Sequence, residues 1–179
     1  MSATTDPAAL TRTVTVDRAR LVAYADCDEA NAVIGLALTL GGEVPEDIAT
    51  VLTTVQNDLF DAGADLASPI EENPKYPPLR IEQAYIDRLE EWIDQFNEEI
   101  EPLDSFILPG GSPAGAYLHV ARTVTRRAER AAWAAVEAYP ETTSALPAKY
   151  LNRLSDLLFV VGRVANPEGD VKWVPGGER

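Results

Sequence analysis

The sequence contains few of the residues from which disulfides and protein metal centres are built. Its 179 residues include one cysteine, Cys27, and one histidine, His119. A single cysteine excludes a disulfide framework within one chain and a cysteine-rich zinc site. A lone histidine needs carboxylate partners before it can bind a metal. We therefore expect no metal held by the protein alone, a packed thiol at Cys27 and a structural role for His119.

Long apolar segments are also absent. No apolar run reaches the roughly 18 residues that a membrane-spanning helix needs. Residues 1–10 have neither the basic part nor the apolar part of a secretory signal. Together with the single cysteine, these absences favour a cytoplasmic protein that has no membrane partner.

Basic residues are scarce, with 15 Lys+Arg against 29 Asp+Glu and a formal net charge of -14. Such a surface repels nucleic acid and anionic membranes, so an anionic ligand needs a local basic pocket. The one dense arginine cluster lies at residues 122–130. Neither a Walker-type phosphate loop nor a Ser–His–Asp arrangement is visible.

Apolar residues recurring at steps of three and four predict five helices. They are expected at residues 17–40, 45–67, 81–99, 112–138 and 148–164. Short links without strand alternation indicate an all-α fold, a five-helix bundle with ferritin-like up-down packing. The bundle is expected to cover residues 17–166, after a short flexible arm at 1–16 and before an irregular tail at 167–179.

The spacing of individual residues supports these helices. In the first helix, positions recur at steps of three and four: Leu21, Tyr24, Asp28, Asn31 and Gly35. In the second helix, one face collects Ile48, Val51, Leu52, Val55, Leu59 and Phe60. Proline and glycine residues are expected to end these helices and to form the loop at 68–80.

The arginine cluster places Arg122, Arg126 and Glu129 on one face of the fourth predicted helix, because they are four and three residues apart. Two guanidinium groups on one helix face are planar and offer many hydrogen-bond donors to a phosphate group. Glu129 can orient one of them. The alternative is a solvated charged face with helical ion pairs. The surrounding alanines favour close packing of this helix.

Three further features have both a functional and an ordinary interpretation. The loop at 106–111 can lay backbone against a ligand, or be a plain turn with Phe106 as a core residue. Asn152, on the same helix face as Asp156, can hydrogen-bond a base or ribose, or be a surface amide. Asp28 can pair with an arginine of the fourth helix or lie near a nucleotide-bound Mg²⁺, or be an exposed acid.

Taken together, these stretches resemble the PduO-type ATP:cob(I)alamin adenosyltransferases in order and spacing. The resemblance extends over residues 20–176 and is carried by segments 24–35, 55–67, 106–130 and 149–166. It implies a five-helix bundle that assembles as a homotrimer with active sites between subunits. The implied reaction transfers the 5′-deoxyadenosyl group of ATP to cob(I)alamin and releases triphosphate, with Mg²⁺ sharing the phosphate charge. Implied partners are a flavin-dependent reductase and an adenosylcobalamin-dependent acceptor enzyme.

The resemblance also implies roles for individual residues. By motif position, Phe106 is similar to the aromatic that fills the lower face of the corrin. Arg126 and Arg127 resemble polyphosphate ligands, Asn152 resembles a nucleotide contact, and Glu129 a support for the arginines. Two further residues, Asp28 and Arg122, resemble the partners of a salt bridge between subunits.

The sequence departs from the family pattern before the first helix. Thr11-Arg12-Thr13 is followed by Val14, without the glycine-rich segment that wraps ATP, and Val16 stands where the family has a phosphate-binding lysine. Backbone amides and an ammonium are strong polyphosphate ligands. Alternatives to catalysis are therefore a corrinoid-binding or delivery protein, a subunit of mixed trimers, and a purely structural bundle.

Overall fold

The computed structural model describes residues 18–177, and within them the chain folds into five helices. The helices are α2 (Arg18–Leu40), α3 (Glu46–Ala67), α4 (Gln83–Asn97), α5 (Pro113–Ala138) and α6 (Leu146–Val164). The expected all-α five-helix bundle is therefore confirmed, with helix boundaries close to those predicted. The expected arm at 1–16, including the departure from the family pattern, lies outside the described residues.

The helix ends follow from local chemistry. Ser112 caps α5, because its Oγ accepts a hydrogen bond from the Gly115 amide at 3.0 Å, and Pro113 occupies the first turn. At the end of α2, a Cβ on Gly41 would lie 2.2 Å from the Ala37 carbonyl oxygen, and Gly42 has a φ of 77°. The paired glycines therefore stop α2 at a turn that other residues adopt poorly.

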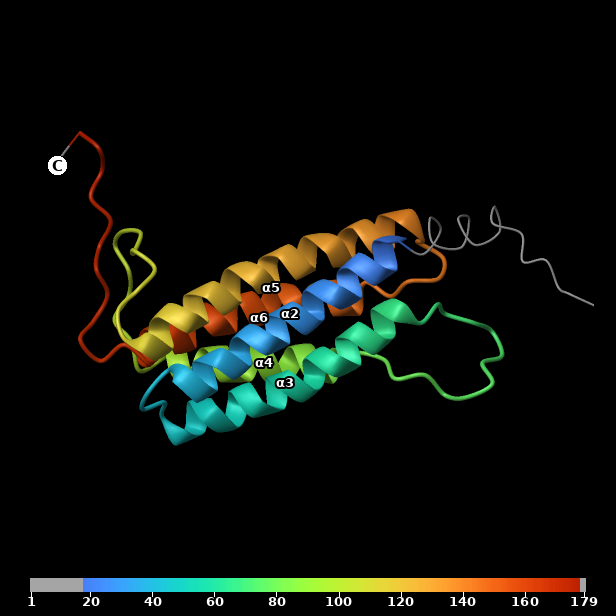
Figure 1. Cartoon of the computed structure of the whole chain (residues 1–179), viewed down its shortest axis with the longest axis horizontal. Coiled ribbons are helices and arrows are strands. Elements are labelled where there is room, and N and C mark those ends of the chain that lie inside the picture. Colours follow the sequence, from blue (N-terminus) through green and yellow to red (C-terminus); the bar gives the residue numbers. More distant parts are fainter. Residues whose placement is uncertain (1–17, 178–179) are drawn as a thin grey trace, which may run out of the picture.

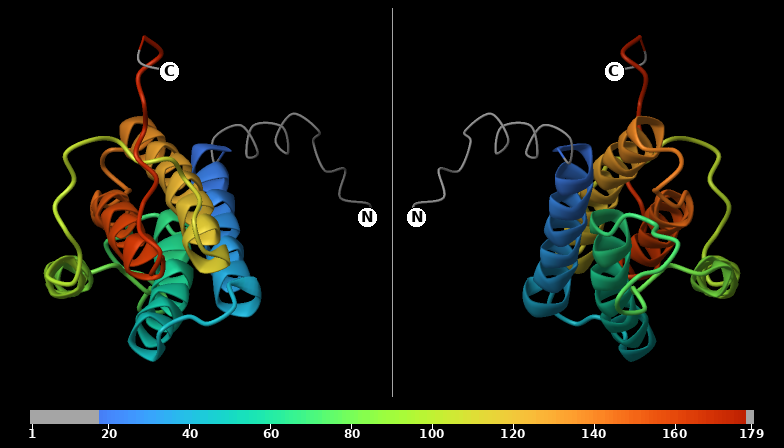
Figure 2. Two further views of the ribbon diagram at one scale, coloured as in Figure 1. Left: turned by 90° about the vertical axis from the view of Figure 1, so that its left-hand side faces the viewer. Right: turned by 90° about the vertical axis from the view of Figure 1, so that its right-hand side faces the viewer.

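α2, α4 and α6 run in one direction along the length of the molecule, and α3 and α5 run in the other (Figure 1). The central pairs are α2 with α5, α5 with α6 and α2 with α3. Viewed end-on, α4 lies outside the other four helices, and its main contact is with α6 (Figure 2). The seam between α5 and α6 is consequently flanked by α2 on one side and by α4 on the other.

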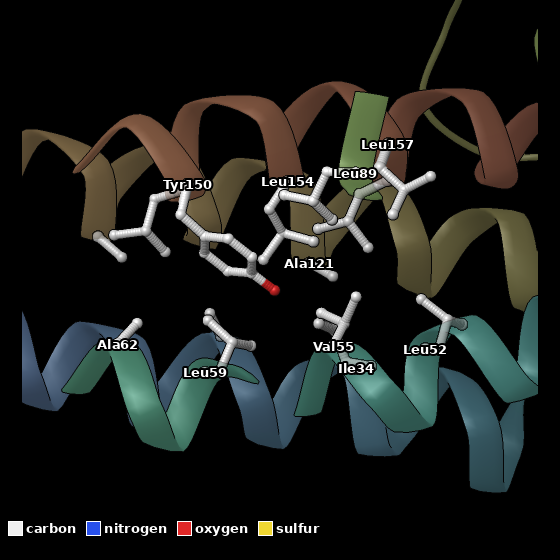
Figure 3. Packing of buried hydrophobic residues seen from close by; sticks show 14 of the residues in the cluster. Ile34, Leu52, Val55, Leu59, Ala62, Leu89, Ala121, Tyr150, Leu154 and Leu157 are labelled. Carbon is white, nitrogen blue, oxygen red and sulfur yellow. The ribbon is translucent and has the colours of Figure 1, made fainter. Parts of the chain in front are cut away.

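The core is built from apolar side chains of all five helices, among them Ile34 of α2 and Ala121 of α5, around the ring of Tyr150 (Figure 3). On α2, the buried side chains are Ala23, Cys27, Ala30 and Ile34. Among the positions whose spacing predicted the helix, Asn31 is buried, whereas Leu21 and Tyr24 are exposed. Small side chains let α2 approach α5 closely, since the distance between helices depends on the residues at the contact.

The buried face of α3 agrees with the prediction except at one position. Ile48, Val51, Leu52, Val55 and Leu59 are buried. Phe60, expected on the same face, is 62% exposed. It follows Leu59 directly, so the 100° turn between consecutive helix residues points it away from the core.

The C-terminal tail is irregular but paired with the loop before α5. The amide of Leu108 donates to the Val171 carbonyl at 2.8 Å, and the amide of Trp173 donates to the Phe106 carbonyl at 2.8 Å. This short antiparallel bridge brings residues more than sixty positions apart in the sequence to one end of the bundle.

Candidate functional site

The predicted site residues of α5 meet α6 along an antiparallel register. Arg126 donates from Nη1 to the Ser155 hydroxyl at 3.4 Å. One turn further along α5, Glu129 accepts from Nδ2 of Asn152 at 2.9 Å. The structure thus brings Asn152 of α6 to the face of α5 on which Arg126 and Glu129 were predicted, and the three residues meet along one seam between the two helices.

Asn152 is also bound on its other side. Its Oδ1 accepts from Nε and Nη2 of Arg153, at 3.2 and 2.7 Å. Arg153 in turn pairs with Asp156 at 2.8 Å. A cleft of about 400 Å³ opens beside this chain of contacts. Its lining comes from α4, α5 and α6: Ile86, Glu90, Glu129, Trp133, Lys149, Asn152 and Arg153.

Arg122 lies at the other end of the seam. Its guanidinium is 5.8 Å from the ring centroid of Phe159, and its buried Nε has no hydrogen-bond partner among the described residues. Burial, together with the nearby charge of Arg126, lowers the pKa of Arg122 from its ordinary value. An arginine always retains its charge in a protein, so this unpaired nitrogen favours an anionic partner from outside the described chain.

A second cleft, of about 690 Å³, lies beside Arg122. It is lined by Leu103, Asp104, Ser105, Phe106, Ile107, Arg122, Phe159 and Trp173. Phe106 is 78% exposed, so it is not a core residue, and its ring meets Trp173 edge-on with centroids 6.0 Å apart. An exposed pair of aromatic rings can bind a flat apolar ligand.

Trp173 is the site residue that the sequence did not reveal. It lies in the tail that was expected to be merely irregular, and only its pairing with the Phe106 backbone brings it to the cleft. The available signal was a tryptophan in a short tail rich in Gly and Pro, because an aromatic ring of this size contributes most of its energy by packing against other groups.

The loop before α5 is fixed from behind by Asn166. The Asn166 Oδ1 accepts from the Ser112 amide at 3.0 Å, and Ser112 Oγ donates to the Ala165 carbonyl at 2.6 Å. Gly111 has a φ of 91°, and a Cβ there would come within 2.4 Å of the Asn166 amide. The expected turn is confirmed, and only glycine fits where the turn comes closest to Asn166, two residues after the end of α6.

Arg127 points to α2 instead of α6. Its guanidinium pairs with Asp26 at 3.3 Å and with Glu29. Asp28, between these two acids, is exposed and has no ion-pair partner among the described residues. The acidic stretch of α2 does meet an arginine of α5, but it does so through the neighbours of Asp28.

The single histidine and the single cysteine are both buried. His119 packs edge-on against Phe159, with centroids 6.1 Å apart, and its Nδ1 has no partner among the described residues. Burial, then the charge of Arg122, lowers the His119 pKa. Burial, then the charge of Asp26, raises the pKa of the Cys27 thiol to about 12, so the thiol stays protonated at neutral pH. In residues 18–177 no group of three or more His, Cys, Asp or Glu side chains is placed to hold a metal ion.

The model of the family described as "Cobalamin adenosyltransferase" matches residues 3–165. The chain belongs to this family. It is 70% identical over 161 residues to the corrinoid adenosyltransferase of Mycobacterium tuberculosis, which covers 90% of this chain and 83% of the relative. It is 41% identical over 162 residues to the corrinoid adenosyltransferase of Bacillus subtilis, covering 88% of this chain and 81% of the relative. Enzymes of one family are thus matched over most of their length.

Solved structures of this family have the same fold. A variant PduO-type ATP:corrinoid adenosyltransferase from Lactobacillus reuteri, complexed with cobalamin and ATP, superposes with a TM-score of 0.77. It is 33% identical, and the match covers 88% of this chain and 87% of that one. Another variant of that enzyme, complexed with ATP, has a TM-score of 0.73 at 32% identity, with 87% of each chain covered. No described helix is long and apolar enough to cross a membrane.

Proposed function

We propose that this chain transfers the 5′-deoxyadenosyl group of ATP to cob(I)alamin, giving adenosylcobalamin and triphosphate. The observation that carries the proposal is the arrangement along the α5–α6 seam. An aromatic cleft lined by Phe106 and Arg122 lies at one end of the seam and a polar cleft lined by Asn152 at the other, with Arg126 between them. The seam therefore offers an apolar surface for a corrin at one end, polar groups for a nucleotide at the other, and two cations along it.

The chemistry needs little acid–base help from the protein. The cobalt(I) of the corrin is itself a strong nucleophile. The cobalt–carbon bond forms at C5′ while the bond from C5′ to the triphosphate oxygen breaks, and the triphosphate leaves with the electron pair. The protein must align the two substrates and stabilise the charge on the leaving group. Mg²⁺ enters as MgATP and shares that charge.

Arg126 is the best placed residue for the triphosphate. It is exposed at the seam, and within residues 18–177 its guanidinium makes a single weak hydrogen bond, with Ser155. Arg127 would have to leave Asp26 and Glu29 before it could bind phosphate. We therefore assign the main phosphate contact to Arg126 and treat Arg127 as a secondary one.

Phe106 is proposed to cover the lower face of the corrin. Its exposed ring and Trp173 form an apolar wall at the mouth of the cleft. Such a wall excludes water and disfavours a polar axial ligand on the cobalt, because a polar group buried without a partner is costly. A cobalt without its lower ligand is easier to reduce to the nucleophilic state.

The site is proposed to be completed by a second subunit of a homotrimer. The buried Nε of Arg122 has no hydrogen-bond partner in the part of the chain that the structure describes, and Asp28 is an exposed acid on another helix. A salt bridge between Asp28 of one subunit and Arg122 of the next would satisfy both groups. The surroundings of Asp28 include exposed apolar side chains, Leu21 and Tyr24, of the kind that interfaces cover.

The reaction also indicates which partner enzymes this protein needs and where it works. Cob(I)alamin must be supplied by reduction, for which a flavin-dependent reductase is the proposed partner. The product is passed to an adenosylcobalamin-dependent acceptor enzyme. A cytoplasmic location is consistent with the single, buried cysteine.

The test is an anaerobic assay with chemically generated cob(I)alamin and MgATP, in which adenosylcobalamin is followed by absorbance. The Arg126→Ala variant should lower kcat/KM for ATP by about 10- to 100-fold, because a charge-assisted hydrogen bond is worth about 1.5–3 kcal/mol. Lys75→Ala, which removes an exposed cation of the loop at 68–80, should leave turnover unchanged.

The outcomes separate catalysis from its alternatives. No product from the wild-type protein, with corrin binding retained, would replace the proposal with a corrinoid carrier or mixed-trimer subunit. Turnover by Arg126→Ala equal to wild type would overturn the assignment of Arg126 while leaving the reaction in place.

A further inference from the structure

The side-chain amide of Asn152 lies between a carboxylate and a guanidinium. Glu129 contacts one end of the amide and Arg153 the other. An ionised carboxylate only accepts hydrogen bonds, and a guanidinium only donates them. The amide therefore has a single orientation that satisfies both neighbours, with its NH₂ group toward Glu129 and its oxygen toward Arg153.

Arg153 is well suited to fix that orientation. Its Nε and Nη2 both reach the Asn152 oxygen, and Nη2 also pairs with Asp156 one turn further along α6. The planar guanidinium holds several acceptors in a set geometry, which a single ammonium cannot do. Without Arg153, the amide could turn its oxygen to other donors at the cleft, such as the ammonium of Lys149.

The fixed amide leaves two groups for a ligand. Nδ2 of Asn152 uses one N–H on Glu129 and keeps the other, and Glu129 keeps a second carboxylate oxygen. Both residues line the same cleft, so a donor and an acceptor stand side by side there. A hydroxyl group, which both donates and accepts, is the chemical complement of this pair.

We propose that Arg153 is a positioning residue, which holds Asn152 as a hydrogen-bond donor next to Glu129 and so creates a subsite for a sugar hydroxyl of the nucleotide. This inference rests on the proposed function, because it needs ATP in the Asn152 cleft. Arg153 itself is occupied by Asn152 and Asp156 and is not assigned a substrate contact.

The experiment compares wild type, Arg153→Gln and Arg153→Lys in the anaerobic assay, with ATP, 2′-deoxy-ATP and 3′-deoxy-ATP as substrates. Arg153→Gln should raise KM for ATP about tenfold, the size of one charge-assisted hydrogen bond, with little change in kcat or in KM for the corrinoid. Arg153→Lys should lie between wild type and Arg153→Gln. Lys75→Gln, with the same loss of one charge, should behave as wild type.

The deoxynucleotides show whether the effect passes through a hydroxyl. In wild type, one of them should have a KM about tenfold above that of ATP, and in Arg153→Gln this difference should largely vanish. An unchanged KM for ATP in Arg153→Gln overturns the proposal. An equal rise in the KM for ATP and in the KM for that deoxynucleotide, with a lowered melting temperature, also overturns it.

The two failures are distinguishable. If wild type forms no adenosylcobalamin, the proposed function fails, and ATP affinity measured by calorimetry on the same variants still tests Arg153. If wild type binds no ATP, the subsite is wrong as well. If wild type turns over and the Arg153 variants match it, only the positioning role is wrong.

Discussion

At the scale of the residue, the neighbours of each arginine side chain decide whether it is available to bind a ligand. Arg126 and Arg127 are adjacent in the sequence, yet one lies exposed at the α6 seam and the other is paired with two acids of α2. A helix turns by 100° per residue, so consecutive side chains meet different helices. Although the chain has a net charge of -14, no carboxylate of the described residues pairs with Arg122 or Arg126.

His119 provides a prediction at the same scale. Its pKa is lowered in the folded protein from an ordinary value near 6.5, because the buried ring is costly to charge and faces Arg122, against a weaker opposite effect of Asp170. The unfolded chain therefore binds more protons as the pH falls below about 6.5. The stability that this group contributes is present above that pH and is lost as the pH falls through the lowered pKa.

We expect His119→Gln to flatten this part of the pH dependence. The measurement is the free energy of unfolding in urea at pH 7.5 and pH 5.5 for both proteins, with the difference between them isolating the histidine from the carboxylates. An equal loss of stability in wild type and variant would show that the His119 pKa is not shifted.

At the scale of the element, α4 is the helix that most needs an anchor, because it lies outside the other four (Figure 2). A buried carboxylate, that of Asp58, helps to hold α4 against the other helices. Asp58 of α3 accepts from Arg88 of α4 at 2.5 Å and from the hydroxyl of Tyr150 of α6 at 3.1 Å. Arg88 also lies over the rings of Tyr85 and Trp92 on its own helix. One ionic centre thus joins three helices beside the polar cleft.

The Tyr150→Phe variant tests this centre. It removes one hydrogen bond from a carboxylate that is nearly fully buried, while the apolar packing of the ring remains. We expect a loss of about 1–3 kcal/mol in the free energy of unfolding, measured in urea, since a buried acceptor is left with fewer partners. A variant as stable as wild type would mean that Arg88 alone satisfies Asp58.

At the scale of the whole molecule, the proposed trimer explains two unpaired charges together. We expect light scattering to give a trimeric mass for wild type and a smaller mass for Asp28→Arg, which places two cations against each other. Exchanging the charges, with Asp28→Arg and Arg122→Asp in one chain, should restore the trimer, because the pair would be re-formed with reversed direction. If Asp28→Arg remains fully trimeric, the salt bridge does not link the subunits.

Much of the fold was predictable from the sequence because its causes are local. Helical periodicity, the Gly41-Gly42 stop and the Pro-rich loops act within a few residues of chain, and the five helices follow from them. The shared face of Arg122, Arg126 and Glu129 is equally local, since it depends only on their spacing. Order and spacing of the motifs also indicated the family, which the matches confirm.

The tertiary structure decided the features that depend on distant neighbours. It buried Ala23, Cys27 and Ile34 of α2 and left Leu21 and Tyr24 exposed, because the first three lie on the face that packs into the bundle. It assigned Arg127 to α2 and brought Trp173 from the tail to Phe106. Burial and pairing are properties of two segments at once, and the pattern of either segment alone does not contain the partner it will meet.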